Sequence, residues 1–387
     1  MSETKQLPRQ VKLFGAVSLL NDFASEMVYP LLPAFVTSVL GGGAIALGAL
    51  DGAADAAAAL VKLVSGRLAD RPARRGPLIV IGYVVAAAVR PIIAITAAAW
   101  QVIGLRVVDR LGKGLRTPPR DALIADVTPE SIRGRAFGLQ RALDHVGAVI
   151  GPLVAWWLLS RNADVRSVIL ASFVPGVIVV LLATVAVRGG RGVAAQPLPP
   201  PPASVRPLPP AVIAIAFFYL LRMPETLIIL HTQRLGIAVA LIPLLWAAVH
   251  VVKASTSLLG GALSDRIGPA RTMWLGWIGY VALAGGMAFA ASPVAAWVLF
   301  LAFGVVAGLT ESPERALVSA VSRGHQGSGF GVYHALTGAA ALVGGLLLGI
   351  IFQTRSGGSA FSVSAAVALG LVILWPFWAR VHSVPTR

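Results

Sequence analysis

The sequence predicts an all-α membrane protein with twelve transmembrane helices, arranged as two six-helix bundles related by pseudo-twofold symmetry. Three observations support this fold class: the composition, the number of long apolar segments and an internal repeat. Of the 387 residues, 57% are hydrophobic and 12% are charged, whereas soluble domains carry about 25% charged residues. Because a soluble chain of this composition would lack the polar side chains to cover its surface, the composition excludes a soluble enzyme.

The apolar segments are long enough to cross a bilayer, which takes about 20 residues. Twelve such segments, numbered as spans one to twelve, lie at 11–39, 45–68, 76–97, 100–125, 134–159, 165–187, 210–232, 239–263, 272–291, 294–320, 327–353 and 359–381. A proline-rich stretch between spans six and seven cannot form a core and is predicted to be an extended linker. We therefore expect an N-terminal six-helix bundle at 1–187, a linker at 188–210 and a C-terminal six-helix bundle at 211–387.

Three patterns occur in the same order in both halves of the chain. GRLADRPARRG at 66–76 corresponds to GALSDRIGPAR at 261–271, TPPRDALIADV at 117–127 to ESPERALVSAV at 311–321, and GRAFGLQRALDHVGAVIGPL at 134–153 to GSGFGVYHALTGAAALVGGL at 327–346. The matches indicate a repeat of six helices. Such repeats are typical of secondary transporters, in which the substrate path lies between the two repeats near the middle of the membrane.

The basic excess of the chain predicts its orientation. Thirty-two Lys and Arg residues oppose 16 Asp and Glu, which gives a net charge of +16. Cytoplasmic loops of membrane proteins are rich in Lys and Arg, so this excess does not indicate a nucleic-acid partner. Arg71, Arg74, Arg75, Arg133, Arg135, Arg188, Arg191, Arg206, Arg266, Arg271 and Arg323 fall on one side, and Arg161, Arg166, Arg234 and Arg355 on the other. Both termini and the linker are therefore predicted to be cytoplasmic, in a bacterial inner membrane.

Charged residues interrupt spans one, two, four, five, seven, eight, ten and eleven. A charge inside a membrane helix must face protein or water, so these helices are predicted to enclose a polar interior. Spans three, six, nine and twelve carry almost no charge and are predicted to face lipid. In span four, the charges share one face within an arc of about 140°: Arg106, Asp109, Arg110, Lys113, Arg116, Arg120 and Asp121.

The intramembrane charges provide the candidate site residues. Acids that burial can neutralise are candidates for proton coupling: Asp22, Glu26, Asp55, Glu225, Glu311 and Glu314. The candidates for substrate binding are Arg106, Asp109, Arg110, Lys113, Asp144, His145 and Arg222, because a guanidinium keeps its charge where a carboxylate can switch. An alternative is that many of these residues form structural ion pairs, since seven acids and eight bases of the first half nearly neutralise one another.

The loop after span two resembles a signature of the major facilitator superfamily, G-x-x-x-D-R-x-G-R-R. It carries Gly66, Asp70, Arg71, Arg74 and Arg75, with Ala73 in place of the second Gly, and the second copy keeps Gly261, Asp265, Arg266, Gly268 and Arg271. The resemblance extends over essentially the whole chain and implies the major facilitator fold. It also implies a gating role for Gly66, Asp70, Arg71, Arg75, Gly261, Asp265 and Arg266.

Two further segments resemble this family. Span four is similar to its R-x-x-x-G-x-G pattern at Arg106 and Gly112, but Arg110 replaces a Gly, which makes this segment unusually basic. Span five carries Gly147, Gly151 and Pro152, which resemble the G-x-x-x-G-P-x-x-G motif of drug:proton antiporters. Small residues allow close helix packing and proline bends a helix. The resemblance implies a gating role for these three residues.

Together these features predict a secondary transporter that exports a small organic solute in exchange for protons by alternating access. The sequence lacks a GxxxxGK[ST] phosphate-binding loop, so an ion gradient is the expected energy source. We expect no cofactor, no resident metal and no enzymatic activity; the partners are the solute, protons and the bilayer, and the protein is expected to be a monomer. The absence of cysteine excludes disulfides and thiolate metal sites.

Three alternatives remain open. Proton-coupled uptake of an anionic solute is favoured by the basic face of span four. Divalent-metal efflux would use Asp22, Glu26, His145 and His231 as ligands. A transporter-like sensor or scaffold that moves no solute would keep the fold without the activity.

The orientation leads to a direct test. A reporter fused after Gln196, within the linker, is expected to be active in the cytoplasm. A periplasmic signal at this position would contradict both the orientation and the division into six plus six helices.

Glu26 is the sequence's best candidate for the coupling acid. It lies one turn after Asp22 in an otherwise apolar span, just before Pro30 and Pro33, which free backbone carbonyls and can bend a helix around a wet cavity. Glu26→Gln keeps the shape and removes the charge, so we expect it to abolish gradient-driven transport in vesicles while substrate binding persists. Full proton-driven transport with an unchanged pH profile would move the role to Asp22 or Asp55.

Overall fold

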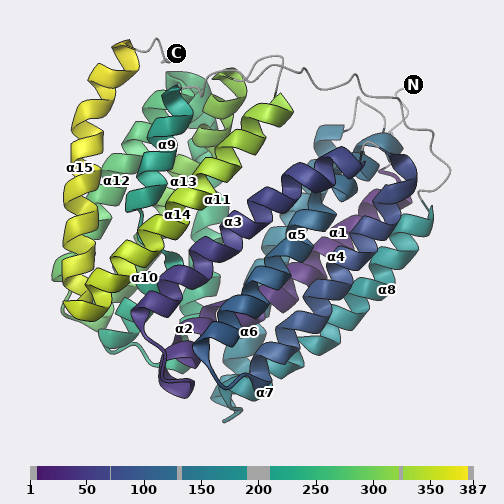
Figure 1. Cartoon of the computed structure of the whole chain (residues 1–387), viewed down its shortest axis with the longest axis horizontal. Helices are drawn as coiled ribbons and strands as arrows, with labels where there is room; N and C mark the ends of the chain where they lie inside the picture. The colour runs from purple at the N-terminus through teal and green to yellow at the C-terminus, as the bar shows by residue number, and fades with distance from the viewer. Residues whose placement is uncertain (1–6, 70, 129–132, 190–209, 322–325, 382–387) are drawn as a thin grey trace. The chain divides into compact units, whose positions relative to one another are not determined.

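The computed structural model describes residues 7–69, 71–128, 133–189, 210–321 and 326–381, and within them every regular element is helical (Figure 1). The helices are α1 (Arg9–Val28), α2 (Leu32–Ala34), α3 (Ala44–Ala69), α4 (Pro72–Ile92), α5 (Ala99–Val127), α6 (Arg133–Ser160), α7 (Val165–Ala171), α8 (Phe173–Gly189), α9 (Pro210–Leu221), α10 (Glu225–Arg234), α11 (Ile242–Ile267), α12 (Pro269–Phe289), α13 (Pro293–Val321), α14 (Gln326–Thr354) and α15 (Gly357–Val381). Short 3₁₀ and π segments extend α1 through α2 to Val39.

All twelve predicted spans are helical, which confirms the predicted fold class. In the described residues, ten segments are long and apolar enough to cross a membrane, and they correspond to every predicted span except one and four. Span one begins with α1 and span four is α5. Both helices carry more charges than a lipid-exposed segment tolerates. On α5, Arg106, Asp109 and Arg116 are buried, whereas the charged residues of α1 are half-buried or exposed.

Two spans are interrupted in ways that the hydropathy pattern does not predict. Span six consists of α7 and α8, which meet at Ser172, and span seven consists of α9 and α10, which are separated by residues 222–224. The second break has a clear cause. Pro224 has no N–H to donate and disfavours helical geometry at the residue before it, so α9 ends and a new helix starts at Glu225.

The chain divides into two compact units. The first unit contains residues 1–29, 57–97 and 104–205, and its core is formed by apolar side chains of α1, α4, α5 and α8, including Phe14, Ile79, Tyr83, Ile124 and Val179. The second unit contains residues 30–56, 98–103 and 206–387. It therefore includes the first part of α3 together with α9 to α15.

Equivalent glycine contacts occur in both halves of the sequence. In α6, Gly147 lies against the backbone of α1 at Leu19, and in α14, Gly344 lies against the backbone of α9 at Leu220. Likewise, Gly114 of α5 contacts α3, and Gly308 of α13 contacts Thr256 of α11. A side chain at any of these glycines would collide with the neighbouring helix, so the repeat preserves the helix pairs as well as the sequence patterns.

The helices predicted to face lipid do expose apolar side chains. Large exposed hydrophobic residues on α8 and α15 include Phe173, Val174, Leu181, Ile373, Leu374 and Phe377. Span three is predicted to face lipid, but its one charged residue, Arg90, is only 4% exposed. This part of α4 therefore faces the protein interior.

Candidate functional site

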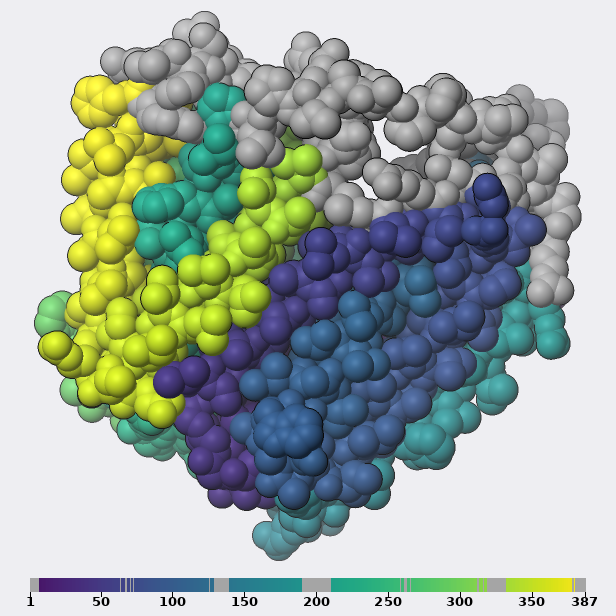
Figure 2. Space-filling view, viewed as in Figure 1, coloured from purple at the N-terminus to yellow at the C-terminus, as the bar shows by residue number. Residues whose placement is uncertain are grey.

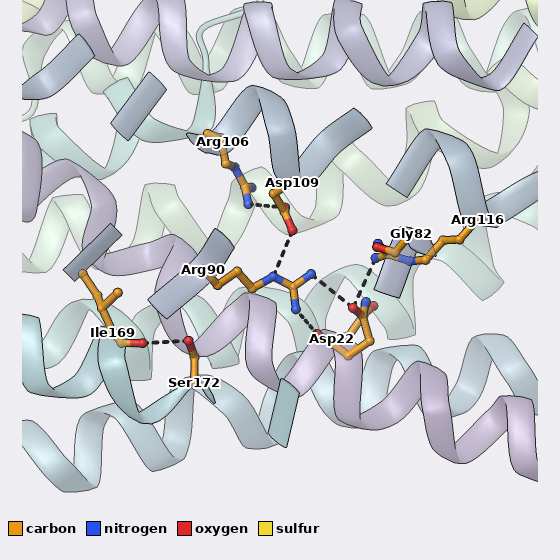
Figure 3. A network of polar contacts seen from close by, with 9 residues as sticks. Asp22, Gly82, Arg90, Arg106, Asp109, Arg116, Ile169 and Ser172 are labelled. Carbon is orange, nitrogen blue, oxygen red and sulfur yellow. Dashed lines mark hydrogen bonds and ion pairs between the residues drawn. The ribbon is translucent and has the colours of Figure 1, made fainter. Parts of the chain in front are cut away.

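A buried arginine cluster lies inside the first unit (Figure 3). We define it as Asn21 of α1, Arg90 of α4, and Arg106, Asp109 and Arg116 of α5. Asp109 is 1% exposed, and its two carboxylate oxygens are shared: Oδ1 accepts from Arg90 Nε at 3.1 Å and Oδ2 accepts from Arg106 Nη1 at 3.3 Å. The two arginines therefore neutralise one acid from two different helices.

The amide of Asn21 connects the other guanidinium groups of the cluster. Arg90 donates to the backbone oxygen and to Oδ1 of Asn21, both at 3.1 Å. Arg116 also donates to Asn21 Oδ1, at 3.2 Å, and to the backbone oxygen of Gly82 at 3.1 Å. The amide nitrogen of Asn21 then donates to Asp22 Oδ1 at 2.9 Å.

Aromatic rings complete the surroundings of these arginines. The Arg106 guanidinium lies 4.8 Å from the ring centre of Tyr29, and that of Arg116 lies 4.6 Å from the ring centre of Tyr83. Cation–π contacts stabilise a desolvated guanidinium. The cluster holds three positive side chains and one negative side chain, so it joins α1, α4 and α5 with a local positive excess.

The other candidate residues of the first unit surround this cluster at different depths. Asp144 is 9% exposed, accepts from Gln140 at 2.7 Å and lies 3.7 Å from Arg141. Asp22, Glu26, Arg110 and His145 are half-buried, and Lys113 is exposed. The structure therefore brings Arg106 and Asp109 together as a buried pair and leaves Lys113 accessible on the same helix.

A second cluster forms at the break between α9 and α10. Glu225 Oε1 lies 2.8 Å from Lys253 Nζ of α11 and 3.6 Å from Arg222. Both cations also lie over the ring of Phe303 in α13, Arg222 at 5.2 Å and Lys253 at 5.0 Å from its centre. The break in span seven thus places Arg222 and Glu225 beside Lys253, with the ring of Phe303 next to both cations.

Glu314 of α13 is 1% exposed and joins this second cluster through Tyr219, whose ring centre lies 5.6 Å from the Arg222 guanidinium. Its Oε2 accepts from the hydroxyl of Tyr219 at 3.3 Å and from that of Tyr333 at 3.1 Å. Of the other candidate acids, Glu311 of α13 is half-buried, whereas Asp55 of α3 is exposed and belongs to neither cluster.

The candidate gating residues are described in part. Arg75 is buried, donates to the backbone oxygen of Ala69 at 2.6 Å and forms an ion pair with Asp126. Arg71 and Arg266 are exposed, and no atom of the described residues lies within 4 Å of the position that a Cβ at Gly66 would take. Asp70 and the side-chain surroundings of Gly261 and Asp265 lie outside the described residues. Gly147 and Gly151 lie against the backbone of α1, and Pro152 is buried.

A divalent-metal substrate would require several His, Asp or Glu side chains to lie close together. No group of three or more His, Cys, Asp or Glu side chains that could hold a metal ion occurs in the described part of the chain. Nε2 of His231 lies 3.0 Å from the backbone oxygen of Met287.

Several side chains within or directly beside the two clusters are not among the sequence candidates. Asn21, Tyr83, Tyr219 and Tyr333 are uncharged, so a count of charges does not find them. Arg90 lies in span three, which the sequence predicts to face lipid because this span carries a single charge. A single arginine in an otherwise apolar span does indicate a buried polar site, because such a residue must have a partner inside the protein.

Known proteins identify the family of this arrangement. A sequence model described as Major Facilitator Superfamily matches residues 14–321 and, a second time, residues 211–387. The chain belongs to the Major Facilitator Superfamily. This member of the superfamily is a membrane transporter rather than an enzyme, in agreement with its sequence resemblance.

Its sequence relatives include proteins of archaea and bacteria. An uncharacterized MFS-type transporter of Methanocaldococcus jannaschii is 26% identical over 363 residues, which cover 90% of each chain. An uncharacterized protein of Mycobacterium tuberculosis is 30% identical over 380 residues, 95% of this chain and 92% of the relative. The multidrug resistance protein MdtH of Yersinia pestis is 30% identical over 162 residues, 42% of this chain and 40% of MdtH.

Solved transporters share the fold at low sequence identity. A POT family transporter in complex with 5-aminolevulinic acid has a TM-score of 0.77 at 13% identity, with 97% of each chain covered. The nucleoside transporter NupG has a TM-score of 0.74 at 12% identity, with 96% of this chain and 99% of NupG covered.

The buried arginine cluster predicts a large loss of stability when its acid is neutralised. Asp109→Asn leaves Arg90 and Arg106 without their shared carboxylate, and breaking a buried ion pair costs about 3–5 kcal/mol. We expect a clearly lower midpoint of thermal unfolding for the purified protein. The matched control is Asp121→Asn on the same helix, whose side chain is 42% exposed beside Arg120, with an expected cost of about 0–1 kcal/mol. Equal midpoints for the two variants would contradict a stabilising role of the cluster.

Proposed function

We propose that this transporter exports a small organic solute in exchange for protons by alternating access. The observation that carries the proton coupling is the environment of Glu314. Coupling requires an acid that can exist with and without its proton inside the protein, and most described acids of the interior are held by cations. Asp109 is shared by two arginines, and Glu225 is within ion-pair distance of Lys253 and Arg222.

Glu314 has a different set of partners. Among the described residues, its carboxylate meets the hydroxyls of Tyr219 and Tyr333, and no Lys, Arg or His nitrogen lies within 4.0 Å of it. A tyrosine hydroxyl can donate to a carboxylate and can also accept from a carboxylic acid. Both protonation states of Glu314 can therefore be hydrogen-bonded at this position, which suits a group that binds and releases a proton.

The break in span seven supports a solute site next to this acid. Discontinuous helices of secondary transporters form substrate and ion sites near the middle of the membrane. Here the break presents Arg222 and Glu225 beside Lys253 and the ring of Phe303. Charges of both signs next to an aromatic surface suit a small organic molecule with polar groups.

Two observations favour export. The G-x-x-x-G-P segment places Gly147 and Gly151 directly against the backbone of α1, a geometry that fits the antiporter motif it resembles. In addition, part of the chain is similar to MdtH, which is described as a multidrug resistance protein. We propose further that the protein is a monomer in a bacterial inner membrane with both termini and the linker in the cytoplasm, and that 1–187 and 211–387 are its two moving bundles.

A second candidate function, proton-coupled uptake of an anionic solute, is favoured by Lys113. Its side chain is exposed on the charged face of α5 and has no hydrogen-bond or ion-pair partner among the described residues. The charged groups that interact with it electrostatically include Arg110, Asp22, Lys62 and Arg116. The direction of solute flux in vesicles under an imposed pH gradient distinguishes this candidate from export.

Proton-driven transport is therefore expected to depend on Glu314 as well as on Glu26. A thermal-shift screen against organic anions, cationic drugs and divalent metals first identifies a ligand, because a bound ligand stabilises the folded protein. We then expect Glu314→Gln in proteoliposomes to lose pH-gradient-driven transport by about tenfold or more while solute binding and exchange persist.

Conservative variants separate the proton role from a packing role. Tyr219→Phe and Tyr333→Phe remove one hydroxyl each, keep the rings and the carboxyl, and are expected to shift the pH profile with smaller losses of rate. Full gradient-driven transport by Glu314→Gln with an unchanged pH profile would contradict the proposed coupling role.

A further inference from the structure

The start of α10 is capped by a residue from a distant helix. The first N–H groups of a helix have no partner within the helix, and Pro224, which precedes α10, provides no side-chain cap. The N–H groups of Leu227 and Ile228 donate to the backbone oxygen of Pro224. Thr226 instead donates to Asp51 of α3, from its N–H at 3.2 Å and from its hydroxyl at 2.8 Å, both to Oδ2.

The two sides of the break in span seven therefore have different supports. On the side of α9, the backbone oxygen of Leu221 accepts from Ser364 of α15 at 2.6 Å, and the N–H of Met223 donates to the hydroxyl of Tyr280 in α12 at 2.7 Å. These helices come from the second half of the sequence, as do α9 and α10. On the side of α10, the support comes from Asp51, in the second predicted span of the first half.

Close backbone packing holds Asp51 in this position. Gly48 of α3 and Gly345 of α14 lie backbone to backbone, and one turn further along α3, Gly52 lies against Leu342. Near the start of α3, the N–H of Ile45 donates to Gln353 Oε1 at 3.2 Å. Figure 2 shows the first part of α3 lying directly along α14. A side chain at either Gly48 or Gly345 would push the two helices apart.

We propose that Asp51 is a positioning residue for transport, which fastens α3 to the start of α10 and so keeps the non-cytoplasmic halves of spans two, seven and eleven closed together. In the predicted topology these halves run from the break in span seven to the side of the membrane away from the cytoplasm. The inference rests on the proposed alternating access, because the contact must then break in every cycle.

The chemistry of the contact suits a fastening that opens repeatedly. The partial positive charge at a helix N-terminus stabilises a carboxylate, and Asp51 is half-buried while Thr226 is fully buried. Water that enters between the helices can replace both hydrogen bonds, so the carboxylate is solvated in the open state and capped in the closed state. The glycines add close contact without side chains that would have to repack.

The absence of cysteine in the sequence allows a direct test. Ala44→Cys places one thiol at a site that is 1% exposed, beside Gly349 of α14. In proteoliposomes, a membrane-impermeant maleimide added from the non-cytoplasmic side should label this thiol slowly. Adding Asp51→Asn removes the charge, and a hydrogen bond to a charged group is worth about a factor of ten or more in the opening equilibrium. We expect labelling to accelerate by about tenfold.

Matched variants identify the cause of any change. Thr226→Val removes one of the two donors to Asp51 and should accelerate labelling by a smaller factor, whereas Thr226→Ser keeps both donors and should restore the parent rate. Thr354→Val, which removes only a bond to Ile350 within α14, should leave the rate unchanged. If Asp51→Asn does not yield a folded protein, the Val and Ser variants at Thr226 still provide the comparison.

The labelling assay needs neither a solute nor a pH gradient. Parent rates of labelling in folded Asp51→Asn or Thr226→Val protein would overturn the role of Asp51 and leave the proposed coupling at Glu314 untouched. Accelerated labelling together with normal coupling at Glu314→Gln would support Asp51 and reject the coupling proposal.

Discussion

The interior of the first unit depends on one carboxylate shared between two helices. Asp109 satisfies Arg106 on its own helix and Arg90 on α4, and Arg90 and Arg116 both reach Asn21 on α1. In a membrane, a buried charge has no water to turn to, so the protein must provide every partner. This requirement explains why α5 can carry a charged face inside the bundle and why polar contacts join it to α1 and α4.

The two clusters suit different roles in a transporter, the first as a fixed framework and the second as a site for a solute and a proton. In the first cluster, the guanidinium groups are already engaged in hydrogen bonds to the Asn21 amide and in cation–π contacts with two tyrosine rings. Because these side chains are buried, little of this cluster is open to a solute. In the second, the break in span seven leaves Arg222 and Glu225 half-buried beside an aromatic ring. Among the described residues, Glu314 is hydrogen-bonded by two hydroxyls and forms no ion pair. Ion pairs suit a fixed framework, whereas neutral partners suit a group that must change its charge.

The sequence was sufficient for features that depend on composition and spacing. The charged face of α5 is turned largely inward, and Gly147 and Gly151 lie against another helix, as their patterns predict. The partners of these residues were not predictable, because they come from distant parts of the chain. Asn21 and Tyr83 have no charge to mark them, and Asp126 meets Arg75 across 51 positions. The break at Pro224 also needed the structure, since proline alone predicts a kink or an end of a helix, but not which groups satisfy the freed backbone.

The spread of the arginine cluster along the chain has a consequence for how the protein is made. Synthesis produces Arg90 before Asp109, so α4 carries a lone charge until α5 follows it. Arg90 lies in the last turn of α4, and a charge at membrane depth needs a partner inside the protein; α5 carries several such charges. Helix α1, already present, offers the oxygens of Asn21 to the first arginine. The partners of Arg90 on α1 are therefore made before it and its acid on α5 after it, so its full set of partners exists only once α5 has been synthesised.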